Sequence, residues 1–84
     1  MMQLLYFGWV RTKIGSGRET LDPPAEITDV RGLVEWLKLR GDGYQEALQD
    51  LETIRVAVNQ EMADLDAPVA PGDEVALFPP MTGG

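Results

Sequence analysis

Near its beginning, the chain carries an apolar stretch from Met2 to Val10 that is too short for most helices and contains three aromatic residues. Such a composition predicts a β-strand. Side chains along a strand alternate between its two faces, which places Leu4 and Tyr6 on one face and Leu5 and Phe7 on the other. Because both faces are apolar, we expect this strand in the middle of a sheet, or with its second face against a partner.

Shorter strand signals follow, separated by turn residues. Strands are expected at residues 18–21, 54–58 and 75–78, with a short edge strand at 61–64. Residues 11–17 predict a loop or a short helical turn, and Asp22-Pro23-Pro24 ends the second strand. Asn59-Gln60 and Pro71-Gly72-Asp73 predict the turns that precede the last two strands.

One helix is predicted clearly. Its apolar positions recur with helical spacing at Val30, Leu33, Val34 and Leu37. Thr28 is a good N-cap candidate, and Asp29 suits the first turn because its charge complements the helix dipole. Gly41 indicates the C-terminal end of this helix. Residues 43–50 predict a second, weaker helix.

In chain order, these elements are two strands, a main helix, a short second helix and then further strands. The order predicts an α+β fold in which the main helix packs on one face of a mixed sheet, and the β-grasp, or ubiquitin-like, arrangement fits it best. The first and last strands are expected side by side in the middle of the sheet. We therefore predict a β-grasp domain over residues 1–78 and an extended C-terminal Gly-Gly tail over residues 79–84.

The tail follows the aromatic residue Phe78 and ends in Gly83-Gly84. Glycine lacks a Cβ, so this pair is the narrowest end that a chain can offer, and it could enter a slot that is closed to other residues. The preceding Pro79 and Pro80 have fixed φ angles and favour a stiff, extended run. The sequence indicates a stalk that presents a bare carboxylate; a frayed terminus without function is the alternative.

The composition argues against several classes of function. The net charge is −7, whereas binding to nucleic acid or to an anionic membrane requires excess lysine and arginine. No apolar run approaches the length of a membrane helix and no signal peptide is recognisable, so a cytoplasmic protein is expected. Cysteine and histidine are absent, which removes disulfides, thiolate nucleophiles and the usual zinc ligands. Asp64 and Asp66 form no recognisable calcium loop, so we predict no metal site and no self-contained enzyme.

Several segments together resemble a known family. They are Leu5-Tyr6-Phe7, Val10-Arg11, Val56-Ala57-Val58-Asn59-Gln60, the run from Gly72 to Pro80, and Gly83-Gly84. In this combination the chain is similar to the small subunits of molybdopterin synthase, which are ubiquitin-like sulfur carriers in molybdenum-cofactor biosynthesis. Met81 departs mildly from the smaller or branched residue that is common at its position.

The resemblance implies a cycle of reactions at Gly84. A ubiquitin-activating-type adenylyltransferase would use ATP and Mg²⁺ to join AMP to the terminal carboxylate, and sulfur would then replace AMP to give a thiocarboxylate. The tail, kept slender by Gly83, would insert into the large synthase subunit and donate sulfur to cyclic pyranopterin monophosphate. The family implies a heterotetramer of two small and two large subunits, with the catalytic groups on the large subunit and no cofactor bound by this chain.

The resemblance also implies a docking surface near the tail. By position, Phe7, Met62 and Phe78 would form an apolar patch, with Arg11 as a polar neighbour. The partner would also contact Pro79, Pro80, Met81 and Thr82. Interfaces are enriched in phenylalanine, methionine and arginine, but ordinary core packing is the alternative for the two phenylalanines.

Other functions are compatible with the same tail. A related carrier could deliver sulfur to thiazole synthesis for thiamine, although such carriers are generally shorter and residues 43–53 argue against this. A protein modifier would instead form isopeptide bonds to lysines. The plainest alternative is a β-grasp interaction module whose tail has no function. The partner that co-purifies with the intact tail would best separate these functions.

Overall fold

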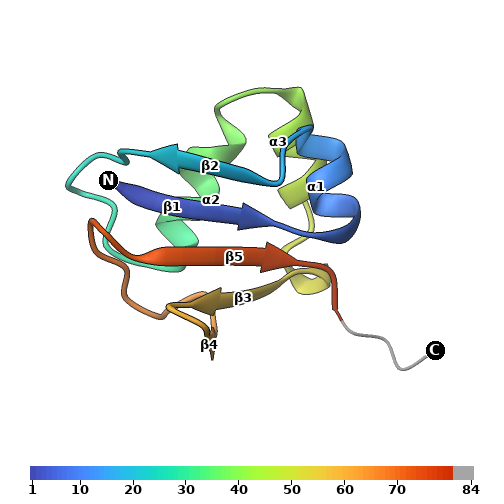
Figure 1. Cartoon of the computed structure of the whole chain (residues 1–84). Helices are drawn as coiled ribbons and strands as arrows, with labels where there is room; N and C mark the ends of the chain where they lie inside the picture. The colour runs from blue at the N-terminus through green and yellow to red at the C-terminus, as the bar shows by residue number, and fades with distance from the viewer. Residues whose placement is uncertain (81–84) are drawn as a thin grey trace.

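The computed structural model describes residues 1–80, and within them five strands form one sheet in the order β2-β1-β5-β3-β4 (Figure 1). The strands are β1 (Met2–Tyr6), β2 (Arg18–Leu21), β3 (Arg55–Val58), β4 (Glu61–Ala63) and β5 (Glu74–Phe78). β1 and β5 run parallel, and the other neighbouring pairs run antiparallel. The prediction of a mixed sheet with the first and last strands side by side is therefore confirmed.

Helices cover one face of this sheet (Figure 1). They are α1 (Gly8–Ile14), α2 (Val30–Lys38), α3 (Asp42–Leu48) and the short 3-10 helix η1 (Leu51–Thr53). The apolar stripe predicted for the main helix is fully buried on α2, and α3 packs against both α1 and α2. The arrangement is the α+β, β-grasp fold that the order of elements predicted, with α1 in addition.

The apolar stretch from Met2 to Val10 is divided between a strand and a helix, so the prediction of one strand across it was wrong. β1 stops at Tyr6, and Gly8, whose φ is +58°, turns the chain into α1. Glycine adopts this left-handed angle without the steric penalty that other residues meet. Val10 is then buried from a helix rather than from a strand. α1 ends at Ile14, and its C-cap Gly15 has a φ of +92°, in the segment where a loop or a short helical turn was expected.

Two helix boundaries also differ from the prediction. The N-cap of α2 is Asp29 rather than Thr28, because the Asp29 Oδ1 accepts a hydrogen bond from the backbone N–H of Gly32 at 2.8 Å. This bond satisfies one of the N–H groups that the first turn of a helix leaves free. α2 ends at Lys38, and Gly41 is the N-cap of α3 rather than the end of α2.

The core lies between the helices and the inner face of the sheet. β1 and β5 contribute Met2, Leu4, Tyr6, Val75 and Leu77, all of them buried. Strand alternation turns the residues between them, such as Leu5 and Ala76, toward the outer face, which no helix covers. None of the helices within residues 1–80 is long and apolar enough to cross a membrane.

β5 ends at Phe78, and the chain leaves the sheet through Pro79 and Pro80 (Figure 1). Met81, Thr82, Gly83 and Gly84 lie outside the described residues. The extended tail over residues 79–84 therefore stays a prediction.

Candidate functional site

The root of the tail is held in the middle of the sheet. β5 pairs with β1 on one side and with β3 on the other. Just beyond β1, the N–H of Phe7 donates a hydrogen bond to the carbonyl of Leu77 at 3.1 Å, and Phe78 lies opposite Arg55 of β3. A strand bonded on both sides opens less readily than an edge strand or a loop. Pro79 therefore leaves from a fixed point of the fold.

Gly8 makes room for the first proline of the tail. A Cβ added to Gly8 would lie 2.7 Å from Cγ and 2.9 Å from Cδ of Pro79, which is closer than such atoms can approach. The same residue has the left-handed φ described above, so two independent constraints favour glycine there. The sequence analysis did not single out Gly8. Its one signal was a glycine inside an apolar run, which is typical of a close backbone approach.

Four of the predicted partner-binding residues meet at the tail root. Phe7, Phe78, Pro79 and Pro80 line an open apolar hollow of about 470 Å³, together with Gly8. The rings of Phe7 and Phe78 pack edge to face, with centroids 6.4 Å apart. Phe7 is 49 % exposed, although it touches Phe78, so it is available to another molecule and is not part of the buried core. The partner-binding role of these residues stays a prediction.

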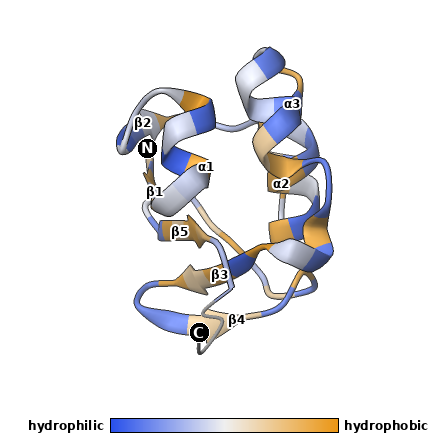
Figure 2. Cartoon of the chain, turned by 90° about the vertical axis from the view of Figure 1, so that its right-hand side faces the viewer, coloured by the Kyte–Doolittle hydropathy of each residue, from blue (hydrophilic) through white to orange (hydrophobic). Residues whose placement is uncertain are grey.

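Met62 lies further away but on the same face. Cross-strand pairing places Leu5 of β1 beside Ala76 of β5, Ala76 beside Ala57 of β3, and Ala57 beside Met62 of β4. Residues that pair across strands point to the same side of the sheet, so these four form one row on the outer face. Met62 is 66 % exposed at its edge. Figure 2, which looks toward the end where β5 finishes, shows the hydrophobic character of β3 and β5.

This row and the two phenylalanines together form a surface that we call the outer apolar face. Its members are Leu5, Phe7, Ala57, Met62, Ala76 and Phe78. Phe7, Met62 and Phe78 were predicted from the sequence, whereas Leu5, Ala57 and Ala76 were not. Alternation along the first strand did place Leu5 opposite the core residues, but only the register between strands shows that the small alanines connect it to Met62. Arg11 stands on α1 and lies against Gly17, where an added Cβ would come 3.2 Å from the arginine Nε.

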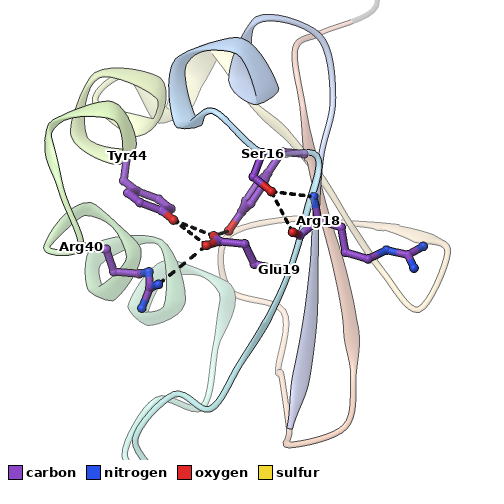
Figure 3. A network of polar contacts seen from close by, with 6 residues as sticks. Ser16, Arg18, Glu19, Arg40 and Tyr44 are labelled. Carbon is purple, nitrogen blue, oxygen red and sulfur yellow. Dashed lines mark hydrogen bonds and ion pairs between the residues drawn. The ribbon is translucent and has the colours of Figure 1, made fainter.

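A polar network occupies the inner side of the sheet (Figure 3). The carboxylate of Glu19 accepts hydrogen bonds from the hydroxyls of Tyr6 at 2.9 Å and Tyr44 at 2.7 Å, and it lies 3.7 Å from the guanidinium of Arg40. Arg40 also stacks over the rings of Tyr44 and Trp36. The network joins β1 and β2 to α3 and to the end of α2, so we assign it to the stability of the fold. Among residues 1–80, no group of three or more acidic, histidine or cysteine side chains could hold a metal ion.

The pKa of the Tyr6 hydroxyl leads to a prediction of how the stability of the protein responds to alkaline pH. Burial, and next the hydrogen bond to Glu19, raise the pKa of Tyr6 well above its ordinary value of 10.0. Folding therefore favours the neutral phenol. This contribution to the free energy of unfolding is complete below about pH 10 and is lost as the pH rises from there toward the folded-state pKa.

Chemical denaturation across this range should show the free energy of unfolding falling above about pH 10. A Tyr6→Phe variant, which cannot ionise at this position, should be less stable at neutral pH but should lose less stability in alkaline solution. An equal loss in the two proteins would contradict this assignment.

The sequence and the fold of this chain are similar to those of known proteins. The model of the ThiS family matches residues 4–84. The molybdopterin synthase sulfur carrier subunit of Escherichia coli (strain K12) is 36 % identical over 84 residues, which cover all of both chains, and that of Haemophilus influenzae is 34 % identical over the same extent. The solved structure of small archaeal modifier protein 1 of Haloferax volcanii is 29 % identical, covers 95 % of this chain and 97 % of that one, and has a TM-score of 0.73. The family match and the full-length relatives show that this chain belongs to the ThiS family.

Proposed function

We propose that this protein is the sulfur-carrier subunit of a molybdopterin synthase. Two observations together support this most strongly: subunits of that name are 36 % and 34 % identical over the full length of the chain, and the tail leaves from the centre of the sheet. The chain has no cysteine, so no side-chain thiol is available to carry sulfur. We therefore place the carrier atom at the backbone terminus, on Gly84.

The proposed chemistry begins with activation of the terminal carboxylate of Gly84. A free carboxylate is ionised at neutral pH, since α-carboxyl groups titrate near pH ~3.5, and it is a poor electrophile. Its oxygen attacks the α-phosphorus of ATP on an adenylyltransferase that also supplies Mg²⁺, which gives an acyl adenylate and pyrophosphate. Sulfide (HS⁻) then displaces AMP, and loss of its proton leaves a thiocarboxylate. ATP and Mg²⁺ belong to that partner, and we place the reactions in the cytoplasm, where ATP is supplied.

The large synthase subunit is the proposed acceptor of the charged tail. In the proposal, the outer apolar face docks on that subunit, with Phe7, Phe78 and Met62 as its largest side chains. Residues 79–84 then enter its channel, where the thiocarboxylate gives one sulfur to cyclic pyranopterin monophosphate and water restores the Gly84 carboxylate. Two such transfers supply the two sulfurs of the dithiolene in molybdopterin. Two small and two large subunits form the complex. The fixed root at Phe78 supports this role, because a tail that starts from a rigid strand loses less freedom when it is inserted.

A second candidate is a protein modifier, and the specific reason is the name of the structural neighbour from Haloferax volcanii. A modifier would pass the activated Gly84 carbonyl to a lysine amine and form an isopeptide bond. The two functions share the first step and differ in the acceptor. Conjugates of higher mass that disappear when Gly83 and Gly84 are deleted would favour the modifier.

Mass spectrometry of the intact chain tests the carrier function. After incubation with the cognate adenylyltransferase, ATP, Mg²⁺ and a sulfide donor, we expect the mass increase that corresponds to exchange of one oxygen for sulfur, located in the C-terminal peptide. Addition of the large subunit and cyclic pyranopterin monophosphate should return the chain to its original mass as molybdopterin forms. A C-terminus that stays a carboxylate while ATP is consumed would contradict the proposal.

A further inference from the structure

The basic residues of the chain differ in their surroundings. On the helix side, three of them are paired: Arg31 with Asp66 at 3.5 Å, Lys38 with Glu35 at 3.5 Å and Arg40 with Glu19 at 3.7 Å. Arg11 and Lys13 of α1 form no salt bridge within residues 1–80. In the part of the chain that the structure describes, Arg18 and Arg55 form no salt bridge. This is notable because the chain carries twice as many acidic residues as basic ones, 14 against 7. Carboxylates are abundant, yet within residues 1–80 none lies within salt-bridge distance of these two arginines.

Both arginines belong to the outer face of the sheet. Arg18 pairs with Leu5 across β2 and β1, and Arg55 pairs with Phe78 across β3 and β5. Paired residues point to the same side, so each arginine stands beside a member of the outer apolar face. Both are exposed, and Figure 3 shows the Arg18 side chain extending away from Glu19, on the other side of the strand. The apolar face is therefore flanked by a guanidinium on two sides.

On the outer face, the charge differs between the start and the end of β5. The same strand turns Glu74 outward beside Gln3, but Glu74 begins the strand and Phe78 ends it. The cationic part of the face is thus the part near the tail root. Arg11 is exposed on α1, which begins just after that end of β1, whereas Lys13 of the same helix lines a hollow on the helix side with Glu46 and Asp50.

We propose that the partner surface covering the outer apolar face carries carboxylates opposite Arg18 and Arg55, and that this partner is the large synthase subunit. The inference rests on the proposed function above. An arginine pairs with a carboxylate through two parallel hydrogen bonds, whereas an arginine covered without a partner loses its hydration and gains nothing in return. A surface that buries the apolar row must therefore supply acidic groups at its two sides.

These two pairs also serve recognition. The rest of this chain is acidic, so an acidic patch on the partner is repelled by most of the surface and attracted only near the tail root. Charge complementarity of this kind raises the association rate and fixes the orientation of docking more than it raises affinity alone. The arginines would thus direct the tail toward the entrance of the partner's channel before the apolar contacts form.

The test compares two double variants that lose the same charge. Association with the purified large subunit is measured by biolayer interferometry at several NaCl concentrations for the unsubstituted chain, for R18A/R55A, and for R31A/K38A, which removes two paired cations from the helix side. We expect R18A/R55A to associate about tenfold more slowly at low salt and to show a weaker salt dependence. R31A/K38A should match the unsubstituted chain.

The outcomes separate this inference from the function on which it rests. If the unsubstituted chain binds the large subunit and both double variants behave alike, the acidic complement is wrong while the carrier function stands. If the unsubstituted chain neither binds the large subunit nor transfers sulfur to its substrate, the proposed function itself is overturned. Thermal unfolding of both variants, expected to match the unsubstituted chain, shows that a slower association does not arise from loss of the fold.

Discussion

Removal of Gly84 is expected to abolish sulfur transfer and to leave the stability of the protein unchanged. The proposed chemistry takes place at the carbonyl of this residue, and a chain that ends at Gly83 presents its carboxylate one residue short of the reacting position. Residues are spaced by about 3.3–3.6 Å along an extended chain, and a displacement of about 1 Å can already cost a hundredfold in rate. We therefore expect product formation below detection, measured as molybdopterin formed in the reconstituted reaction.

The core supplies the control for this deletion. Within residues 1–80, the buried apolar residues of the core lie between Met2 and Leu77. Glycine has no side chain to pack, so we expect loss of Gly84 to leave this core intact. The unfolding curve of the shortened chain should superimpose on that of the full chain. Retention of sulfur transfer by the shortened chain would rule out Gly84 as the carrier residue, and a shifted unfolding curve would show that the tail contributes to the fold.

Replacement of Phe7 by aspartate should weaken binding to the large subunit by about a hundredfold. Phe7 is half exposed, packs edge to face on Phe78 and lines the hollow at the tail root. Large aromatic residues at the centre of an interface commonly contribute most of the binding energy, and a carboxylate in the same place would be buried without a partner. Isothermal titration calorimetry with the large subunit measures the change.

Leu39 offers a matched control for this substitution. It is 84 % exposed and lies just after α2, away from the outer apolar face. Leu39→Asp makes the same change in charge and removes an exposed apolar side chain of similar size, so its affinity for the large subunit should equal that of the unsubstituted chain. Equal weakening by the two substitutions would indicate a general effect of charge and would remove Phe7 from the docking surface.

The sequence predicted those parts of the fold that depend on local patterns. The stripe on α2 has helical spacing, and the first strand has apolar residues on both faces, so the main helix and the position of β1 inside the sheet could both be expected. The break after Tyr6 could not, because it depends on the left-handed conformation of Gly8 and on the proline that packs against it from the other end of the chain. Local spacing carries no information about such a contact.

The candidate site shows the same division. Phe7, Met62, Phe78 and the two prolines were identified through family resemblance. The structure brings the phenylalanines and prolines together around one hollow, and strand register places Met62 on the same face of the sheet as Phe78. Ala57 and Ala76 were missed because small residues are unremarkable in sequence and acquire a role only when pairing connects them. Glu19 was missed for a related reason. The hydroxyls that donate hydrogen bonds to its carboxylate belong to residues 13 and 25 positions away in the sequence.

The central position of β5 has a consequence for synthesis of the protein. Of the five strands that the structure describes, β5 is the last to leave the ribosome, yet it fills the gap between β1 and β3, so this sheet cannot be completed until Phe78 has emerged. Contacts between the two ends of a chain are the slowest to form, and domains fold as units once the necessary segments have emerged. A nascent or truncated chain would thus lack the strand that mounts the tail. An activating protein that requires the outer face of the finished sheet would spend ATP only on completed carriers.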